Sequence, residues 1–376
     1  MIELESIIMR LAVFNVENLF DRARAFDTNN QAVLDAFGRA QALLAEPVYS
    51  AATKAQIIAE FTTLGLLRSD SNANVLLRQS KGNLLKRPKS APPEIVANGR
   101  ADWVGSLELN RAPVNHEAML NTARVIRDLS ADVLGVVEAE HRPSLGDFNA
   151  DILGSPVVGG TAYRHVMLID GNDDRGIDVG LMTGPAHPIG LMRSRVDDRR
   201  TNGSPLFSRD CPEYHITTPG GARLLVMVVH FKSKFGGNDA KSQAKRRDEA
   251  ARVAALYQAH RAAGIDHIAI MGDFNDTPDS APLAPLLAGT DLVDSFTLPV
   301  HDDGGFPGTH GNCRAGTKID YILLSPAMAA AATASGVIRT GMRPNKGAPP
   351  WPIYPTLTRQ VEAASDHAAL WVDVAI

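Results

Sequence analysis

The segment at positions 267–278, His-Ile-Ala-Ile-Met-Gly-Asp-Phe-Asn-Asp-Thr-Pro, constrains the fold of this chain more than any other. Its apolar run has the length and composition of a strand that is buried on both faces. Gly272 then allows the chain to turn, and Pro278 prevents an immediate return to regular structure. Asp273 and Asn275 stand two positions apart, so in extended backbone their side chains share one face at the strand end. An isolated Asp-x-Asn is more often a polar turn than a functional site, so its meaning depends on the rest of the chain.

The composition limits the classes of protein to consider. The 376 residues are 44% hydrophobic and 21% charged, which suits one large domain or two ordinary ones with a sizeable core. A net charge of −4 argues against a protein that coats nucleic acid through its overall field, but leaves room for a local basic patch. The two cysteines lack metal-binding spacing and favour a reducing compartment. No apolar run reaches the roughly 18 residues of a membrane span, and the N-terminus lacks the features of a signal peptide, so we expect a cytoplasmic location.

Polar residues suited to chemistry stand at the ends of five predicted strands, and one more stands inside a sixth. In chain order they are Asn15 with Glu17, Glu138, His230, Asp273 with Asn275, Asp320, and Asp366 with His367. The strands are expected at residues 10–16, 132–137, 223–229, 268–271, 318–324 and 368–374. The ends of strands converge on one edge in open α/β architectures, so these side chains can meet although they are far apart in sequence.

The segment at about 22–112 differs from the strand-rich remainder. Much of it is rich in Ala, Leu and Gln with helical spacing, and a basic run with prolines follows between Lys81 and Lys89. We interpret it as an inserted helical segment, whose basic run is more often a solvated loop than a contact for an anionic partner. Further helices are expected over 115–129 and 241–261.

Carboxylates and amides dominate the set of strand-end residues, and cysteine is absent from it. Such oxygen donors suit Mg²⁺ or Mn²⁺, and the chemistry they imply is phosphoryl hydrolysis with a His or Asp that positions and deprotonates water. Each residue has a simpler interpretation: Glu138 as a strand-end charge, His230 as a core histidine, and Asp320 as a partner for Lys318. Groups of complementary chemistry on six strands nevertheless favour a common site.

Six motifs in this order resemble the endonuclease/exonuclease/phosphatase family, the deoxyribonuclease-I-like metal-dependent phosphoesterases. They are Asn15-Val-Glu17, the apolar run ending in Glu138, Val229-His230-Phe231, Gly272-Asp273-Phe274-Asn275, Ile319-Asp320-Tyr321 and Ser365-Asp366-His367. The resemblance spans nearly the whole chain except about 22–112. It implies a four-layer α/β sandwich, with two mixed sheets face to face and helices outside. We therefore expect a single domain over 1–376 with a helical insert at about 22–112, which is an addition to the family pattern.

The resemblance also implies a role for each motif residue. Metal ligands would be Glu138 as the principal one, Asn15 beside it, and Glu17 and Asp366 as further ligands. Catalytic residues would be Asp273 and Asn275, which orient water and phosphate, His230 and His367, which flank the phosphate, and Asp320, which pairs with His367. Phosphate contacts would come from Arg209, in a deoxyribonuclease-like Ser-Arg-Asp segment, from Arg175 as a second candidate, and from Lys232 and Lys234. Which histidine acts as acid or base stays open.

Three functions follow from this resemblance. A Mg²⁺-dependent phosphodiesterase that acts on nucleic acid, like an endonuclease, is our first expectation, because Arg209 and the basic residues of 232–247 can follow a phosphate backbone. A phosphatase or phospholipase is the alternative, although the chain lacks the Trp-rich signatures of inositol-phosphate phosphatases. An inactive binding protein on the same fold is the third, and the retention of every expected catalytic group argues against it. DNA or RNA preference, endo or exo action, the number of metals and the oligomeric state are not determined by the sequence.

Overall fold

The computed structural model describes residues 8–19, 31–110, 115–173, 176–234, 239–344, 347 and 349–376. It divides the chain into two compact units. The main unit consists of Met1–Phe20 and Asn115–Ile376, and the inserted unit is Asp21–Val114. Arg175, a predicted phosphate contact, lies outside the described residues.

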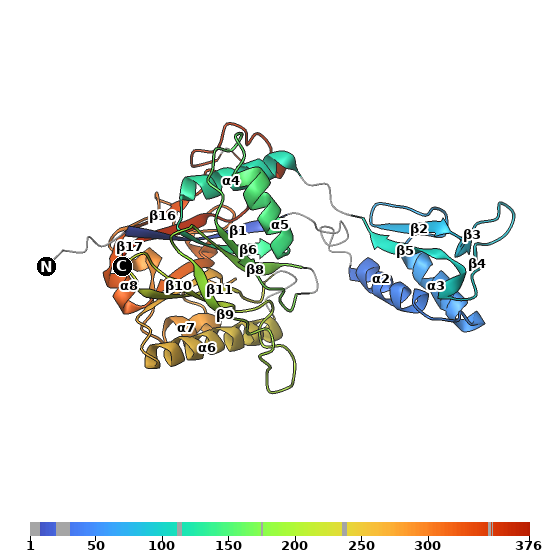
Figure 1. Ribbon diagram of the computed structural model, residues 1–376, viewed down its shortest axis with the longest axis horizontal. Coiled ribbons are helices and arrows are strands. Elements are labelled where there is room, and N and C mark those ends of the chain that lie inside the picture. The colour runs from blue at the N-terminus through green and yellow to red at the C-terminus, as the bar shows by residue number, and fades with distance from the viewer. Residues whose placement is uncertain are drawn as a thin grey trace. The chain divides into compact units, whose positions relative to one another are not determined.

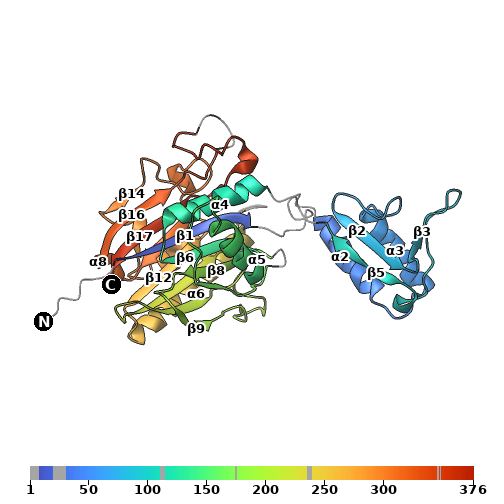
Figure 2. The same cartoon turned by 45° about the horizontal axis from the view of Figure 1, so that its top comes forward.

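Two mixed sheets form the middle of the main unit (Figures 1 and 2). The strands of sheet 1 are β1 (Ile8–Leu19), β6 (Val133–Ala139), β7 (His165–Leu168), β8 (Asp178–Thr183), β14 (His301–Asp302), β16 (Ala332–Ile338) and β17 (Ala369–Ala375). Those of sheet 2 are β9 (Ile189–Arg193), β10 (Glu213–Thr217), β11 (Arg223–His230), β12 (His267–Asp273), β13 (Val293–Asp294) and β15 (Asp320–Leu324). Sheet 1 has the order β14-β16-β17-β1-β6-β8-β7, and sheet 2 the order β13-β15-β12-β11-β10-β9. Parallel pairs such as β1 with β6 and β11 with β12 make both sheets mixed.

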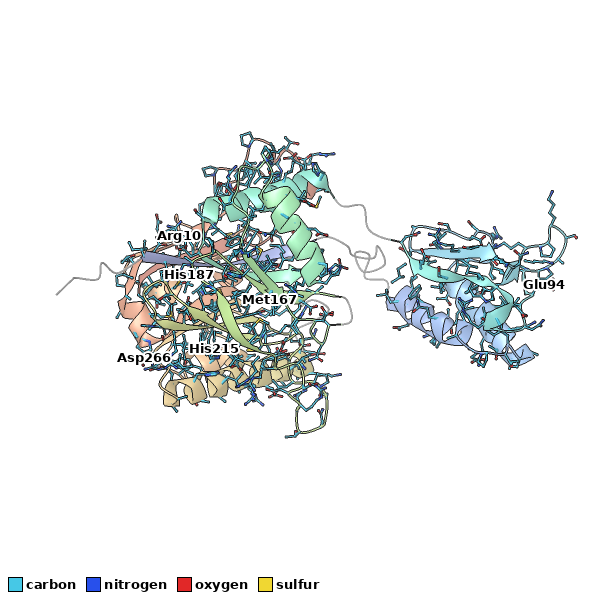
Figure 3. All side chains as sticks on the ribbon, in the orientation of Figure 1. Arg10, Glu94, Met167, His187, His215 and Asp266 are labelled. Carbon is cyan, nitrogen blue, oxygen red and sulfur yellow. The ribbon has the colours of Figure 1, made fainter. Side chains whose placement is uncertain are left out.

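The two sheets face each other across one apolar core. Leu11 and Val13 of sheet 1 pack in the same buried cluster as Val226, Val228 and Met271 of sheet 2. The strands carry apolar residues on both faces because helices cover their outer faces as well. Met167 of sheet 1, labelled in Figure 3, packs against this cluster.

Helices complete the outer layers. On sheet 1 lie α4 (His116–Leu129) and α5 (Arg142–Asp147), and on sheet 2 lie α6 (Ala240–Ala262) and α7 (Ala284–Leu287), while the short α8 (Pro326–Ala330) follows β15. Asn115 caps the first turn of α4, where its side chain accepts from two backbone N–H groups, and Asp239 caps α6. The arrangement of helix, sheet, sheet and helix confirms the predicted four-layer sandwich.

The inserted unit has a core of its own. It begins with the expected helices, α2 (Gln31–Leu44) and α3 (Ala51–Thr63), and then adds two small antiparallel sheets that the sequence interpretation did not include. Their strands are β2 (Val75–Lys81) with β5 (Val104–Leu109), and β3 (Leu85–Lys86) with β4 (Glu94–Ile95). The buried Trp103 donates from its indole to the hydroxyl of Tyr49 at 3.1 Å, and that hydroxyl donates to the carbonyl of Leu44 at 2.7 Å. This hydrogen-bonded chain satisfies both polar groups inside the apolar core.

Charged groups of the inserted unit pair largely with one another. Within the predicted basic run, Arg87 donates to the carbonyl of Leu66 and forms an ion pair with Asp70 at 2.8 Å. Lys81, Lys86 and Lys89 are exposed.

Within the part of the chain that the structure describes, none of the helices has both the length and the apolar composition of a membrane span.

Candidate active site

The register of sheet 2 brings three predicted residues into adjacent positions. His230 of β11 pairs with Asp273 of β12, and Asp273 pairs with Asp320 of β15. Because paired residues in neighbouring strands have side chains on the same face, these three side chains form a row across the sheet. All three are buried.

Asn15 connects this row to sheet 1. It pairs with Val137 of β6, one residue before Glu138, and its side-chain amide donates to Glu138 Oε1 and to Asp273 Oδ2, both at 3.2 Å. The two sheets are therefore joined by hydrogen bonds at this edge as well as by their apolar core. Glu138 is 17% exposed, so its carboxylate reaches the surface of the site.

Three site residues other than glycine have positive φ. The values are +49° at Glu17, +67° at Glu138 and +55° at Asn275. Residues other than glycine adopt this region at a cost, and such residues concentrate at functional sites. Glu17 and Glu138 lie within β1 and β6, at shifts of register, and not past the ends of these strands as expected, whereas Asn275 follows the end of β12.

Asp273 lies at the centre of the group. Its Oδ1 accepts from the backbone N–H of Asn275 at 2.7 Å. Its Oδ2 lies 3.2 Å from Asn15 Nδ2, 3.6 Å from His230 Nε2 and 3.9 Å from His367 Nε2. Burial, followed by the charge of Asp320, raises the pKa of Asp273 to about 7.

Asp320 and His367 form a buried dyad. Both oxygens of Asp320 lie against His367 Nδ1, at 2.9 and 3.1 Å. Burial disfavours the imidazolium, but the carboxylates of Asp320, Asp273 and Asp366 outweigh it and raise the pKa of His367 well above its ordinary value. The bond at Nδ1 leaves Nε2 directed toward Asp273 and Asp366. The simpler interpretation of Asp320 is wrong, because the Lys318 amine forms its ion pair with Asp294 at 2.7 Å.

Glu17 and Asp366 meet on the other side of His367. The carboxylate of Glu17 accepts from the backbone N–H of Asp366 at 2.9 Å. Although the Glu17 side chain keeps an exposed surface, partial removal of its carboxylate from water, together with the charges of Asp366 and Glu138, raises its pKa to about 7.

His310 belongs to the same cluster, although the sequence patterns did not predict it. Its Nε2 lies 3.0 Å from Asp366 Oδ2, and its ring centroid lies 4.7 Å from that of His367. This hydrogen bond is the main cause that raises the pKa of His310. His310 stands in a glycine-bounded loop rather than at a predicted strand end, so no periodic pattern could have indicated it.

The predicted phosphate contacts have other partners in this structure. The Arg209 guanidinium is 3% exposed, lies 3.1 Å from Asp173 and donates to the carbonyl of Phe231. Lys234 forms an ion pair with Asp276 at 2.5 Å, while Lys232 is half-buried. Phosphate binding by Arg209, Lys232 and Lys234 therefore stays a prediction.

The expectation that the basic residues of 232–247 follow a phosphate backbone is wrong for Arg246. Arg246 is fully buried, where its Nε donates to Asp276 and its Nη1 to the carbonyl of Lys232. It therefore holds two site loops together and offers no charge to a nucleic-acid backbone.

The donors present fit a divalent cation. Among the described residues, ligand atoms within 4.8 Å of one another occur in Glu138, His230 and Asp273, in Asp273, Asp320 and His367, and in His310, Asp366 and His367. Each of these groups contains imidazole as well as carboxylate, and none contains a thiolate. The carboxylate oxygens are the donors that suit Mg²⁺ or Mn²⁺.

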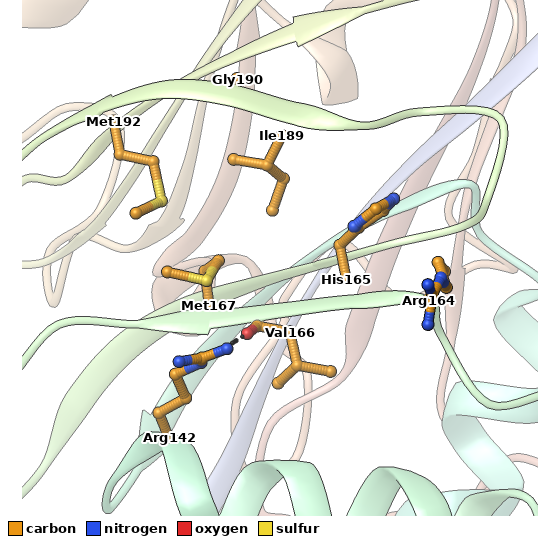
Figure 4. Close-up of a pocket in the computed structure, with 8 residues that line it drawn as sticks. All are labelled: Arg142, Arg164, His165, Val166, Met167, Ile189, Gly190 and Met192. Carbon is orange, nitrogen blue, oxygen red and sulfur yellow. Dashed lines mark hydrogen bonds between the residues drawn. The ribbon is translucent and has the colours of Figure 1, made fainter.

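A separate cavity of about 200 Å³ lies between β7 of sheet 1 and β9 of sheet 2, the edge strands of the two sheets (Figure 4). The side chains of Met167, Ile189 and Met192 point into the space between the two strands, and Arg142 donates to the carbonyl of Val166 at 2.9 Å. None of the predicted site residues lines this cavity, so it is distinct from the candidate active site.

Solved structures share this fold. An endonuclease/exonuclease/phosphatase family protein from Bacteroides thetaiotaomicron has a TM-score of 0.53 at 13% sequence identity, and the similarity covers 98% of this chain and 97% of that one. The mannosyl-6-phosphatase of Bacteroides thetaiotaomicron VPI-5482 has a TM-score of 0.51 at 17% identity, over 69% of this chain and 91% of that one. The first similarity must include nearly all of the inserted unit. No curated protein sequence matched this chain.

A sequence model described as Endonuclease/Exonuclease/phosphatase family matches residues 104–367. The match includes the predicted site residues from Glu138 to His367, while Asn15 and Glu17 on β1 precede it. Most of the chain is covered, and the fold agrees. This protein belongs to the endonuclease/exonuclease/phosphatase family.

Proposed function

We propose that this protein is a Mg²⁺- or Mn²⁺-dependent phosphodiesterase that hydrolyses nucleic acid by attack of water at phosphate. Membership of the family implies a hydrolase acting on phosphoesters, and the proposal narrows that class. The observation that carries it is the convergence of three nitrogen atoms, from Asn15, His230 and His367, on one oxygen of Asp273 within 3.9 Å. Two imidazoles and an amide around a carboxylate supply both the donors that bind phosphate oxygens and a base for water.

Each residue then has a defined task. Glu138 and Asn15, with Glu17 and Asp366, would hold the cation, which when bound would polarise a phosphate oxygen and stabilise the leaving group. Asp273 orients the attacking water and accepts its proton or passes it to an adjacent imidazole. Asn275 fixes the loop, since its side chain donates to the carbonyl of Phe231 at 3.1 Å.

The dyad holds one histidine in a single tautomer. With Nδ1 of His367 bound to Asp320, Nε2 faces the phosphate position, where it donates a hydrogen bond or transfers a proton. His230 Nε2 lies on the other side of Asp273, between it and Glu138 at 3.8 Å. The two imidazoles thus flank the place where the scissile phosphate would bind.

The experiment is a substrate panel with purified full-length protein, with Mg²⁺, Mn²⁺ or chelator. Single- and double-stranded DNA, RNA and bis(p-nitrophenyl) phosphate represent diesters, while sugar phosphates and p-nitrophenyl phosphate represent monoesters. We expect diester hydrolysis that requires metal, and losses of about a hundredfold to ten-thousandfold in Asp273→Ala and His367→Ala with the fold intact. Asp279→Asn, an exposed carboxylate in the same loop, is the control. Wild-type rates in both site variants would refute the site assignment.

Monoester hydrolysis alone would instead support a phosphatase. The similarity in fold to a mannosyl-6-phosphatase makes sugar phosphates the monoesters to include first.

We further propose that the inserted unit is an addition within a single catalytic domain, and that the protein is cytoplasmic.

A further inference from the structure

The loop segment Thr309–Gly311 bridges the two parts of the candidate site. On one side it pairs with the strand-end segment 366–368, where Ala368 donates to the carbonyl of Thr309 at 2.7 Å and Gly311 donates to the carbonyl of Asp366 at 2.8 Å. These bonds place His310 opposite His367 in an isolated antiparallel bridge. The position of the His310 backbone is therefore set by the same residues that carry the site.

The other side of the segment holds the start of β15. The hydroxyl oxygen of Thr309 accepts from the backbone N–H of Ile319 at 3.0 Å and of Asp320 at 3.1 Å. One short segment thus contacts both the Asp320 end of the dyad and the Asp366–His367 end. Two glycines permit this path: Gly311, the last residue of the segment, has φ +62°, and a Cβ at Gly308, just before it, would lie 2.2 Å from the carbonyl oxygen of Arg314.

The imidazole of His310 contacts Asp366 directly. Its Nε2 lies 3.0 Å from Asp366 Oδ2, while the other oxygen, Oδ1, lies 3.6 Å from His367 Nε2. A carboxylate rotates broadly about its last torsion, so a hydrogen bond to one oxygen determines where the other one points. Without His310, Asp366 would keep its backbone bond to Glu17 but lose the contact that orients its side chain.

We infer that His310 is a positioning residue, which holds the Asp366 carboxylate in the orientation needed to bind the divalent cation together with Glu17. The inference rests on the proposed function, because Asp366 and Glu17 are proposed ligands. It adds a hydrogen-bonding partner behind a metal ligand, and such partners typically change metal affinity about 10- to 100-fold when removed.

The test measures Mn²⁺ binding by calorimetry and by the electron paramagnetic resonance of free Mn²⁺, without substrate. We expect His310→Ala to weaken Mn²⁺ binding about 10- to 100-fold, and to lower hydrolysis at limiting Mn²⁺ more than at saturating Mn²⁺. His310→Gln should restore most of the affinity, because its amide can donate to Asp366 Oδ2. His301→Gln is the matched control, since the His301 imidazole contacts Ser335 outside the site at 2.9 Å.

A double variant separates positioning from a general structural effect. If His310 acts through Asp366, His310→Ala should add little to the loss already caused by Asp366→Asn. The inference would be overturned if the two substitutions were fully additive, if His310→Ala kept wild-type Mn²⁺ affinity, or if glutamine did not restore that affinity. It would also be overturned if the wild-type protein bound no Mn²⁺. The proposed function fails separately, if the wild-type protein binds Mn²⁺ but hydrolyses no phosphodiester.

Discussion

Substitution of Gly272 by alanine tests how closely the two central strands of sheet 2 must approach. Gly272 pairs with Val229 across β11 and β12, immediately before the His230–Asp273 pair. An alanine Cβ at this position would lie 1.8 Å from the carbonyl oxygen of Val229. Carbon and oxygen in contact stand at about 3.3–3.6 Å, so the strands would have to separate by about 1.5 Å.

The expected cost has two parts. The overlap is with backbone, which cannot move aside as a flexible side chain can, and overpacking of this kind costs about 1–3 kcal/mol. The φ of +147° adds about 1–3 kcal/mol for any residue with a Cβ. The free energy of unfolding should therefore fall by about 2–6 kcal/mol, a large part of the roughly 5–15 kcal/mol that stabilises a typical protein.

Calorimetry of the full-length chain is the assay, because it can resolve the transition of the main unit from that of the inserted unit. Gly184→Ala is the control, since its Cβ would meet its nearest neighbour, the carbonyl oxygen of Asp132, at 3.8 Å, and should change stability by less than about 0.5 kcal/mol. Any folded Gly272→Ala protein should also lose about a hundredfold in activity, because displacement by about 1 Å separates reacting groups. Equal stability of the two alanine variants would refute this reasoning.

Three further predictions concern buried carboxylates. Asp320→Asn should lower the steady-state activity about a hundredfold to ten-thousandfold while thermal stability is kept. The reason is that the amide no longer fixes the charged form and the tautomer of His367. A wild-type rate would argue against the dyad. Burial raises the pKa of Asp178 to about 7, so the folded state binds its proton more tightly than the unfolded state, and stability is lost as pH rises from about 4 to 7. Asp178→Asn should therefore match the wild type in melting temperature near pH 4 and exceed it at pH 8, and equal melting temperatures at pH 8 would contradict this. Glu249→Gln should cost about 1.5–3 kcal/mol in urea unfolding, because each oxygen of the fully buried carboxylate accepts from a backbone N–H, of Ser208 and of Lys232, both at 2.7 Å, and the amide group would leave one of these N–H groups without an acceptor. An unchanged unfolding midpoint would contradict this role.

Local patterns were sufficient for the six strands that carry the motif residues, whereas β9 and β16 of the main unit were not expected. Apolar runs such as residues 268–271 are recognisable because burial on both faces leaves no polar position within the strand. Gly272 and Asp273 stand directly after this run, and a glycine followed by a polar residue indicates the end of a buried strand. The resemblance supplied the layered fold, which the structure and the family match confirm.

Only the tertiary structure shows which charged residues form ion pairs when they are far apart in sequence. Lys318 is two residues from Asp320 but pairs with Asp294. Arg246, expected among the basic residues that can follow a phosphate backbone, is buried against Asp276. The strands of the inserted unit also escaped detection, because short two-stranded sheets leave a weak periodic signal.

The sequence by itself determined which strands carry the polar site residues, because alternation and turns are properties of neighbouring residues. The exact ends differ: Asp320, expected inside a strand, is the first residue of β15, and Glu138, expected at an end, lies inside β6. It did not determine that His230, Asp273 and Asp320 form one row, since register depends on pairing across the whole sheet. Nor did it indicate His310, whose contact with Asp366 exists only because a loop folds back 56 residues along the chain. Local sequence patterns thus indicate which residues belong to the site, and long-range packing sets the distances between them.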